Sequence, residues 1–297
     1  MRESARAWSD AMADLDARAE APGLVALALP TPTLPPASTT NHWLVGWTRM
    51  VVVDPATPDR RAQRRLVHLV DAARKAGAEP VALFLSHHHL DHCGAAADLA
   101  GQLRLPVWCH AATRPLLPAW VEVAGEVAEG DEVAVNADGA VWRALHTPGH
   151  APGHLVLHEA LSGWMVAGDM VAGQGTILID PRDGDMGQYL ASLERMQALA
   201  PLALAPAHGP VLRDATQVLA YYQRHRRERE ARILASLTNR PREPADLLPS
   251  AYADVPRMTW PLALRSLESH LVHLQQQGLA LRTSSGWLAN KQAESTG

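Results

Sequence analysis

Short apolar runs alternate with longer amphipathic segments over the first two thirds of the chain. Residues 42–46, 50–55 and 81–85 are such runs, bounded by residues that favour turns, which predicts short buried strands. Residues 59–76 place apolar side chains at helical spacing and Gly77 follows as a stop signal, so we predict a helix there. The same reasoning predicts an amphipathic helix or a ragged arm over residues 1–22, a helix over 95–103, a strand over 106–109 and several strands between 132 and 167. This order of strands and helices is typical of an α/β fold.

The last third of the chain changes to helical periodicity. Residues 215–237 read as one long helix, and residues 261–277 as another with leucines at three- and four-residue spacing. Gly278 ends the second helix. The two short apolar runs that follow, 279–282 and 287–289, predict a hairpin. We therefore expect a small separate module after the α/β part.

Side chains of the kind that bind metals cluster after the predicted strand at 81–85. Loops that leave a strand carry much of the chemistry of α/β proteins. Imidazole nitrogens and carboxylate oxygens suit divalent zinc, manganese or iron. The candidate ligands are His87, His89, Asp91 and His92, followed by His150, Asp169 and His208, each of these three after a strand-like run. Seven groups exceed the needs of one tetrahedral ion, so the sequence predicts two ions that share a carboxylate.

The run HxHxDH, followed in order by His, Asp and His, resembles the metallo-β-lactamase superfamily over roughly residues 24–213. The resemblance implies an αββα sandwich with the site at the shared edge of its sheets. It also implies which residues bind which ion: His87, His89 and His150 hold one, Asp91, His92 and His208 hold the other, and Asp169 bridges them. Asp54 matches a position that braces the metal loop, although a turn-capping aspartate explains it equally well.

The tail resembles that of lactamase-β-like hydrolases with a C-terminal winged helix, a branch that includes a single-strand endoribonuclease. We accordingly predict a metallo-β-lactamase-like catalytic domain over residues 1–214 and a linker helix with a winged-helix-like domain over 215–292. The predicted recognition helix carries little positive charge, with Arg265 balanced by Glu268. We therefore expect this module to pack or to form a homodimer contact instead of reading DNA.

Composition bears on the partners and the cellular compartment that we expect for the protein. The net charge of -4 gives no electrostatic footprint for nucleic acid over the whole chain. Cys93 and Cys109 cannot form a disulfide framework, and we expect Cys93 to be a small buried thiol and not a ligand. The first 20 residues mix charges where a signal peptide needs an apolar run, and no stretch approaches a membrane span. These features predict a cytoplasmic protein that is not embedded in a membrane.

The predicted chemistry is hydrolysis by a water that two metal ions activate, with Asp91 orienting it or accepting its proton. A thioester, ester or lactone is the favoured small-molecule substrate because of the acidic net charge. Single-stranded RNA is the alternative, favoured by the tail and by the arginine-rich segment 224–232, whose Glu228 and Glu230 also allow a solvated helix face. A DNA-binding regulator is the third hypothesis, and it needs a basic face that the tail does not supply.

Overall fold

The computed structural model describes residues 2–290 and divides the chain into two compact units. The first unit consists of residues 1–147, 153–176 and 199–216. The second consists of residues 148–152, 177–198 and the chain from 217 onward. The predicted division between residues 214 and 215 stays a prediction.

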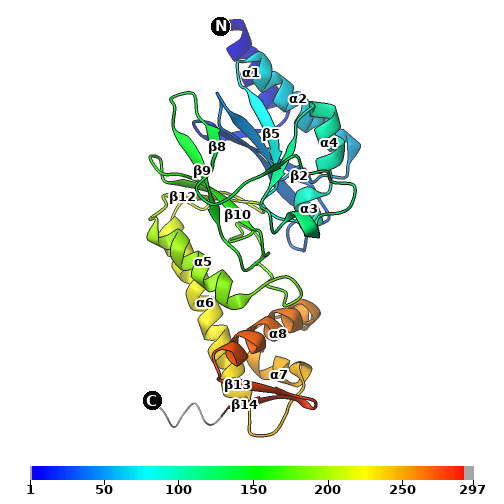
Figure 1. Ribbon diagram of the computed structural model, residues 1–297, viewed down its shortest axis with the longest axis vertical. Helices are drawn as coiled ribbons and strands as arrows, with labels where there is room; N and C mark the ends of the chain where they lie inside the picture. Colours follow the sequence, from blue (N-terminus) through cyan, green and yellow to red (C-terminus); the bar gives the residue numbers. More distant parts are fainter. Residues whose placement is uncertain (1, 291–297) are drawn as a thin grey trace. The chain divides into compact units, whose positions relative to one another are not determined.

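Two sheets form the centre of the first unit (Figure 1). One sheet has seven strands in chain order: β1 (Arg18–Ala21), β2 (Leu24–Pro30), β3 (Thr39–Val45), β4 (Met50–Val53), β5 (Pro80–Phe84), β6 (Val107–Cys109) and β7 (Gly125–Glu126). The other has the order β12-β11-β10-β9-β8, formed by β8 (Glu132–Val135), β9 (Val141–His146), β10 (Leu155–Glu159), β11 (Trp164–Gly168) and β12 (Ala203–Pro206). The strands expected from the apolar runs are thus present, but residues 18–21 form a strand where an amphipathic helix or a ragged arm was predicted.

Apolar side chains fill both faces of the seven-stranded sheet. Trp43 and Phe84 pack with Trp142 and Leu157 of the other sheet in one buried cluster. The second face packs against helices, where Leu66 belongs to a separate cluster. Burial on both faces explains why the central strands read as continuous apolar runs without alternation. The helices of this unit are α1 (Arg2–Asp14), α2 (Arg60–Lys75), α3 (Leu90–Cys93) and α4 (Ala96–Leu103), with a short 3-10 helix at Arg114–Leu116.

Parallel pairing brings several loops to one edge of the two sheets. β4, β5 and β6 run parallel, so the residues after β4 and β5, including Asp54 and His87, leave at the same edge. β11 and β12 are also parallel, and Asp169 and His208 follow them. The Leu155 amide donates to the Ser86 carbonyl at 2.9 Å, which joins the two sheets at this edge. The fold therefore collects the loops that carry most of the predicted ligands.

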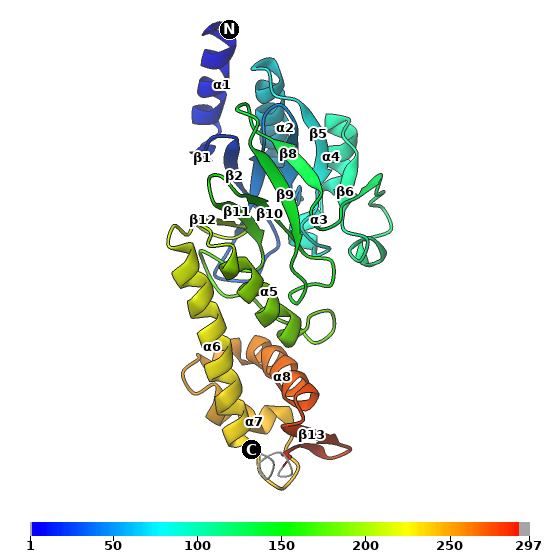
Figure 2. The same cartoon turned by 60° about the vertical axis from the view of Figure 1, so that its left-hand side comes forward.

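The second unit holds a small apolar core of its own. Its elements are α5 (Met186–Ala198), α6 (Ala215–Ser236), α7 (Pro244–Ala251), a 3-10 helix at Arg257–Thr259, α8 (Trp260–Gln276) and the hairpin β13 (Ala280–Thr283) and β14 (Gly286–Ala289). Ile233, Leu247, Leu267 and Trp287 meet in one buried cluster, which joins α6, α7, α8 and the hairpin (Figure 2). The predicted fold class, a mixed α/β sandwich followed by a winged-helix-like domain, is confirmed.

None of the helices between residues 2 and 290 has both the length and the apolar character needed to cross a membrane.

Substitution of Leu267 by alanine should destabilise the second unit, because this fully buried side chain lies at the centre of its core. We expect a loss of about 2–5 kcal/mol in the free energy of unfolding, measured by urea denaturation. Leu281→Ala is the matched control, since 43% of Leu281 is already exposed. Equal stability of the two variants would contradict the core assignment.

Candidate metal centre

The loop after β5 places imidazole rings close together. His87 is fully buried, and its Nε2 lies 2.9 Å from Nδ1 of His89. Two nitrogens at such a separation are close enough to bind one cation with bonds of about 2.0–2.1 Å. The chain then turns into α3, whose first residues bring Asp91 and His92 to the same region. The ring centroids of His87 and His92 are 4.0 Å apart.

Asp169 and His208 complete a cluster in the first unit. The Oδ2 atom of Asp169 lies 3.6 Å from His92 Nε2, and its Oδ1 atom lies 3.4 Å from His208 Nε2. The Oδ2 atom of Asp91 lies 3.6 Å from His208 Nε2. Within the described residues of the first unit, two sets of three residues have ligand atoms that all lie within 4.8 Å of one another: His87, His92 and Asp169, and Asp91, His92 and His208. Asp169 thus lies between His92 and His208, and its bridging role stays a prediction.

The state of His92 tests whether this cluster fits a cation. Its Nδ1 donates to Asp54 Oδ2 at 2.8 Å, whereas its Nε2 is buried and has no hydrogen-bond partner. The hydrogen bond to Asp54 keeps the proton on Nδ1, so in the neutral ring Nε2 carries the lone pair, which is the arrangement of a metal-binding histidine. Burial would lower the pKa of His92, but Asp169, Asp54 and Asp91 together raise it well above its usual value. This electronegative setting and the nitrogen and oxygen donors fit a divalent cation.

Asp54 holds the loop that carries these ligands. Its Oδ1 accepts from the Ser86 amide at 2.7 Å, and its Oδ2 accepts from the Ser86 hydroxyl at 2.8 Å as well as from His92. The side chain is 2% exposed, and its backbone has the left-handed φ of 53°. A non-glycine residue in this conformation stores strain that the surrounding contacts must offset. The predicted bracing role of Asp54 is confirmed by these hydrogen bonds, and the turn-capping alternative does not describe them.

Hydrogen bonds from residues outside the ligand set orient Asp169 and His208. His154 is fully buried, and its Nε2 accepts from the Asp169 amide at 3.1 Å. A Cβ atom on Gly168 would lie 2.5 Å from that nitrogen, so glycine permits the close approach. The Nδ1 atom of His208 donates to the Thr39 carbonyl at 3.0 Å. The sequence suggested a supporting role for His154 but gave no signal for Thr39, whose contribution comes from its backbone.

His150 belongs to the second unit, where it lies on the segment 148–152. It is buried, and its Nδ1 donates to the Leu178 carbonyl at 2.9 Å. A hydrogen bond at Nδ1 leaves Nε2 as the nitrogen that can bind a cation. The assignment of His150 to the first ion stays a prediction from the family resemblance. His88, which was expected to be a spacer, is partly exposed.

The two cysteines are free thiols inside the first unit. Burial raises the pKa of Cys93 to about 12 and that of Cys109 to about 12. Burial therefore makes both thiols weak nucleophiles at neutral pH. The prediction that Cys93 is a small buried thiol is confirmed.

Comparisons with known proteins agree with this geometry. Residues 36–208 match the family model described as the metallo-beta-lactamase superfamily, and residues 244–287 match that of the beta-lactamase associated winged helix domain. The chain is 29% identical over 252 residues to "Beta-lactamase-like protein 2 homolog" of Drosophila melanogaster, a match that covers 80% of this chain and 83% of the relative. It is 30% identical over 164 residues to "Atrochrysone carboxyl ACP thioesterase" of Aspergillus terreus, with 54% of this chain and 47% of that protein covered.

Solved structures show the same fold. A beta-lactamase domain protein from Burkholderia ambifaria has a TM-score of 0.78 and 21% identity, with 92% of this chain and 93% of that chain covered. A metallo-beta-lactamase family protein from Thermus thermophilus has a TM-score of 0.73 and 22% identity, with 91% of this chain and 100% of that chain covered.

Replacement of Asp54 by asparagine should weaken metal binding, because an amide has one acceptor oxygen and cannot accept from the Ser86 amide on one side and from the Ser86 hydroxyl and His92 on the other. We expect metal affinity to fall about 10–100-fold, measured by competition with a chromophoric chelator. Asp59→Asn, an exposed change at the start of α2, is the control. An unchanged affinity in a folded Asp54→Asn protein would show that the bracing is dispensable.

Proposed function

Because this chain belongs to the metallo-beta-lactamase superfamily and is a metal-dependent hydrolase, we propose that it uses two divalent cations to hydrolyse a thioester, ester or lactone. The observation that carries the proposal is the ligand cluster around the buried Nε2 of His92, which has no hydrogen-bond partner and lies 3.6 Å from Asp169 Oδ2. We propose zinc in preference to manganese or iron, because the cluster is rich in imidazole and its acidic ligands are few. The expected cytoplasmic setting stays a prediction.

Divalent cations at such a site lower the pKa of a bound water and polarise the carbonyl under attack. The residues of this chain would supply position and proton transfer. In the proposal, Asp169 holds its two oxygens between His92 and His208, at 3.6 and 3.4 Å from their Nε2 atoms. Asp91 is the more open carboxylate, with 18% of its side chain exposed against 11% for Asp169. Asp91 would therefore orient the attacking water and accept its proton.

Apolar side chains near the ligands support an acyl substrate. Leu90 stands between His89 and Asp91 in the sequence and is 55% exposed. Leu34, which is 44% exposed, follows Thr33, whose hydroxyl lies 3.4 Å from His208 Nε2. Exposed leucines beside a polar site can contact the hydrocarbon part of a substrate. The thioesterase name of the Aspergillus terreus relative supports the same class.

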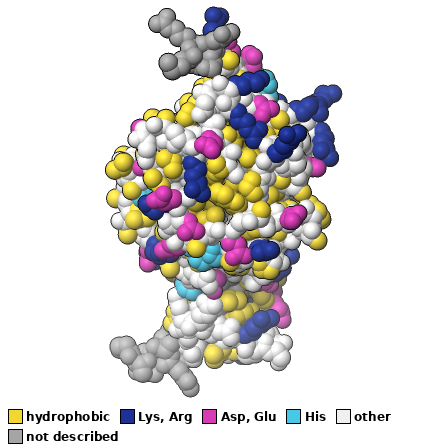
Figure 3. All heavy atoms as spheres, turned by 45° about the horizontal axis from the view of Figure 1, so that its top comes forward, with side chains coloured by type: hydrophobic (Ala, Val, Ile, Leu, Met, Phe, Trp, Pro, Cys, Tyr) yellow, Lys and Arg dark blue, Asp and Glu magenta, His cyan; other side chains and the backbone are white. Residues whose placement is uncertain are grey.

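The arginine-rich segment that favoured RNA has structural contacts instead. Arg226 and Arg229 are 4% and 5% exposed. Arg226 donates to the Ile177 carbonyl, and Arg229 donates to Asp254 Oδ1 at 2.8 Å. Buried guanidinium groups cannot reach a phosphate backbone. The more exposed arginines of the segment are each paired with a carboxylate: Arg224 with Glu228, Arg227 with Glu194 and Arg232 with Asp254. On the face drawn in Figure 3, several basic side chains gather at the upper right, and the others are scattered among acidic and apolar ones. An RNA phosphodiesterase is therefore the second candidate.

The predicted recognition helix, α8, supports a packing role for the winged-helix module. Arg265 on this helix is paired with the Asp180 carboxylate within the second unit. Its positive charge is thus neutralised, which disfavours a contact with DNA phosphates. A DNA-binding regulator is the least supported of the three hypotheses, and we propose a packing or homodimer contact for this module.

A substrate panel tests the bond that is hydrolysed. Zinc-loaded protein should cleave at least one member of a set of acyl thioesters, esters and lactones faster than bis-p-nitrophenyl phosphate or single-stranded RNA. Asp169→Ala should reduce this rate to background, because it removes the carboxylate between His92 and His208. Asp138→Ala, an exposed turn residue, is the control. Cleavage of RNA alone, lost in Asp169→Ala, would replace the acyl proposal with the phosphodiesterase.

Metal content tests the number of ions. We expect two ions per chain by elemental analysis of zinc-loaded, dialysed protein, and about one in His208→Ala, which loses a ligand of the second site. His68→Ala, an exposed position on α2, should keep the parent value. At most one ion in the parent, even after loading, would exclude the dinuclear site.

A further inference from the structure

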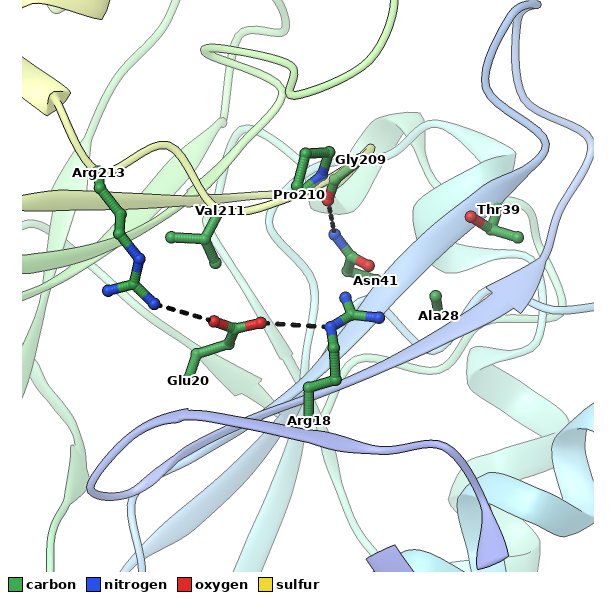
Figure 4. A pocket seen from close by; sticks show the side chains of 9 residues that line it. All are labelled: Arg18, Glu20, Ala28, Thr39, Asn41, Gly209, Pro210, Val211 and Arg213. Carbon is green, nitrogen blue, oxygen red and sulfur yellow. Dashed lines mark hydrogen bonds and ion pairs between the residues drawn. The ribbon is translucent and has the colours of Figure 1, made fainter. Parts of the chain in front are cut away.

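A hollow lies in the first unit beside the turn that carries His208. It has a volume of about 480 Å³, and its lining includes Arg18, Glu20, Ala28, Thr39, Asn41 and Arg213. β1, β2 and β3 supply one wall, and the residues after His208 supply the other (Figure 4). Arg18 and Glu20 are two residues apart on β1, so both side chains project from the same face of the strand. The small side chain of Ala28 leaves the space open.

The charges in this hollow favour an anion. Arg18 Nε donates to Glu20 Oε1 at 3.3 Å, and Arg213 Nη2 lies 3.5 Å from Glu20 Oε2. One carboxylate thus faces two guanidinium groups, and one positive charge remains. Within the described residues, the two terminal nitrogens of Arg18 have no hydrogen-bond or ion-pair partner, and Figure 4 shows them turned toward Asn41 and Ala28. A guanidinium presents paired N–H groups that match a carboxylate or a phosphate.

The wall of the hollow also orients a predicted metal ligand. The side-chain nitrogen of Asn41 donates to the Pro206 carbonyl at 3.0 Å and to the Gly209 carbonyl at 2.8 Å, which spans the turn that carries His208. Thr39 accepts from His208 Nδ1 at 3.0 Å. Asn41 is 3% exposed, so this link is firmly packed. A ligand against Asn41 would restrict the same turn that aims His208.

We propose that this hollow binds a small oxyanion, a carboxylate or a phosphate group of a small molecule, through Arg18 and Arg213. Because Asn41 and Thr39 support both the hollow and His208, occupancy should be coupled to metal binding at His208. Coupling of this kind is reciprocal, so the metal should also tighten the binding of the anion.

Isothermal titration of the full chain with inorganic phosphate and, separately, with malonate tests the site and distinguishes its two ligand chemistries. Each probe is titrated into zinc-loaded and into chelator-treated protein, because an anion can also bind directly to the metals. We expect binding that persists after chelation and weakens about tenfold or more in Arg18→Ala, which loses a charge-assisted hydrogen bond. Arg61→Ala, an exposed arginine on α2, should bind like the parent.

Glu20→Gln should have the opposite effect on anion binding from Arg18→Ala. Removal of the carboxylate that competes for both arginines should tighten anion binding by up to about fivefold. Zinc affinity should rise when the better probe is added to the parent and should not rise in Arg18→Ala. Absence of binding at millimolar probe, equal binding by a folded Arg18→Ala protein, or binding that vanishes on chelation would overturn the site. Equal effects on zinc affinity in parent and variant would overturn the coupling.

Discussion

The carboxylate of Asp54 is the contact on which the candidate metal centre depends. It joins the end of β4 to Ser86 and His92 through three hydrogen bonds, and it does so from a buried position. Parallel pairing of β4 and β5 brings the two loops together, and the hydrogen bonds then fix the orientation of the His92 ring. Without this fixed ring, the carboxylates of Asp91 and Asp169 would face an imidazole with no defined lone pair.

The sequence predicted the helices and strands better than it predicted the residues that orient the candidate metal ligands. Continuous apolar runs identified the central strands, and the leucine spacing of 261–277 identified α8, which spans Trp260–Gln276. The candidate ligands were visible because histidine and aspartate at short spacing have few other uses. Thr39 binds His208 through its backbone carbonyl, and Ser86 donates to Asp54, which follows the neighbouring strand β4. Neither contact leaves a pattern in the sequence. β1 was missed because residues 18–21 alternate charged and small residues next to a helix.

The number of charged residues in a segment does not show whether their charges can reach a substrate in this protein. The positive segment of α6 looked like an RNA contact, yet its central arginines are enclosed and satisfied by carbonyl and carboxylate oxygens. The carboxylates of Asp91 and Asp169 in the ligand cluster act on the buried His92, whose pKa they raise. The position of a charge relative to the protein surface therefore carries more information about the substrate than its frequency in the chain.

Arginine makes up 25 of the 27 basic residues, and the second unit shows that part of this usage is structural. The guanidinium of Arg229 lies 4.2 Å from the ring centroid of Tyr252 while it donates to Asp254. Lysine offers a compact charge on a flexible stem and cannot stack and bind a carboxylate in two places at once. An exchange of arginine for lysine, which most surfaces tolerate, is therefore not conservative at this position. The arginine-rich part of α6 thus accepts fewer substitutions than its charged composition suggests.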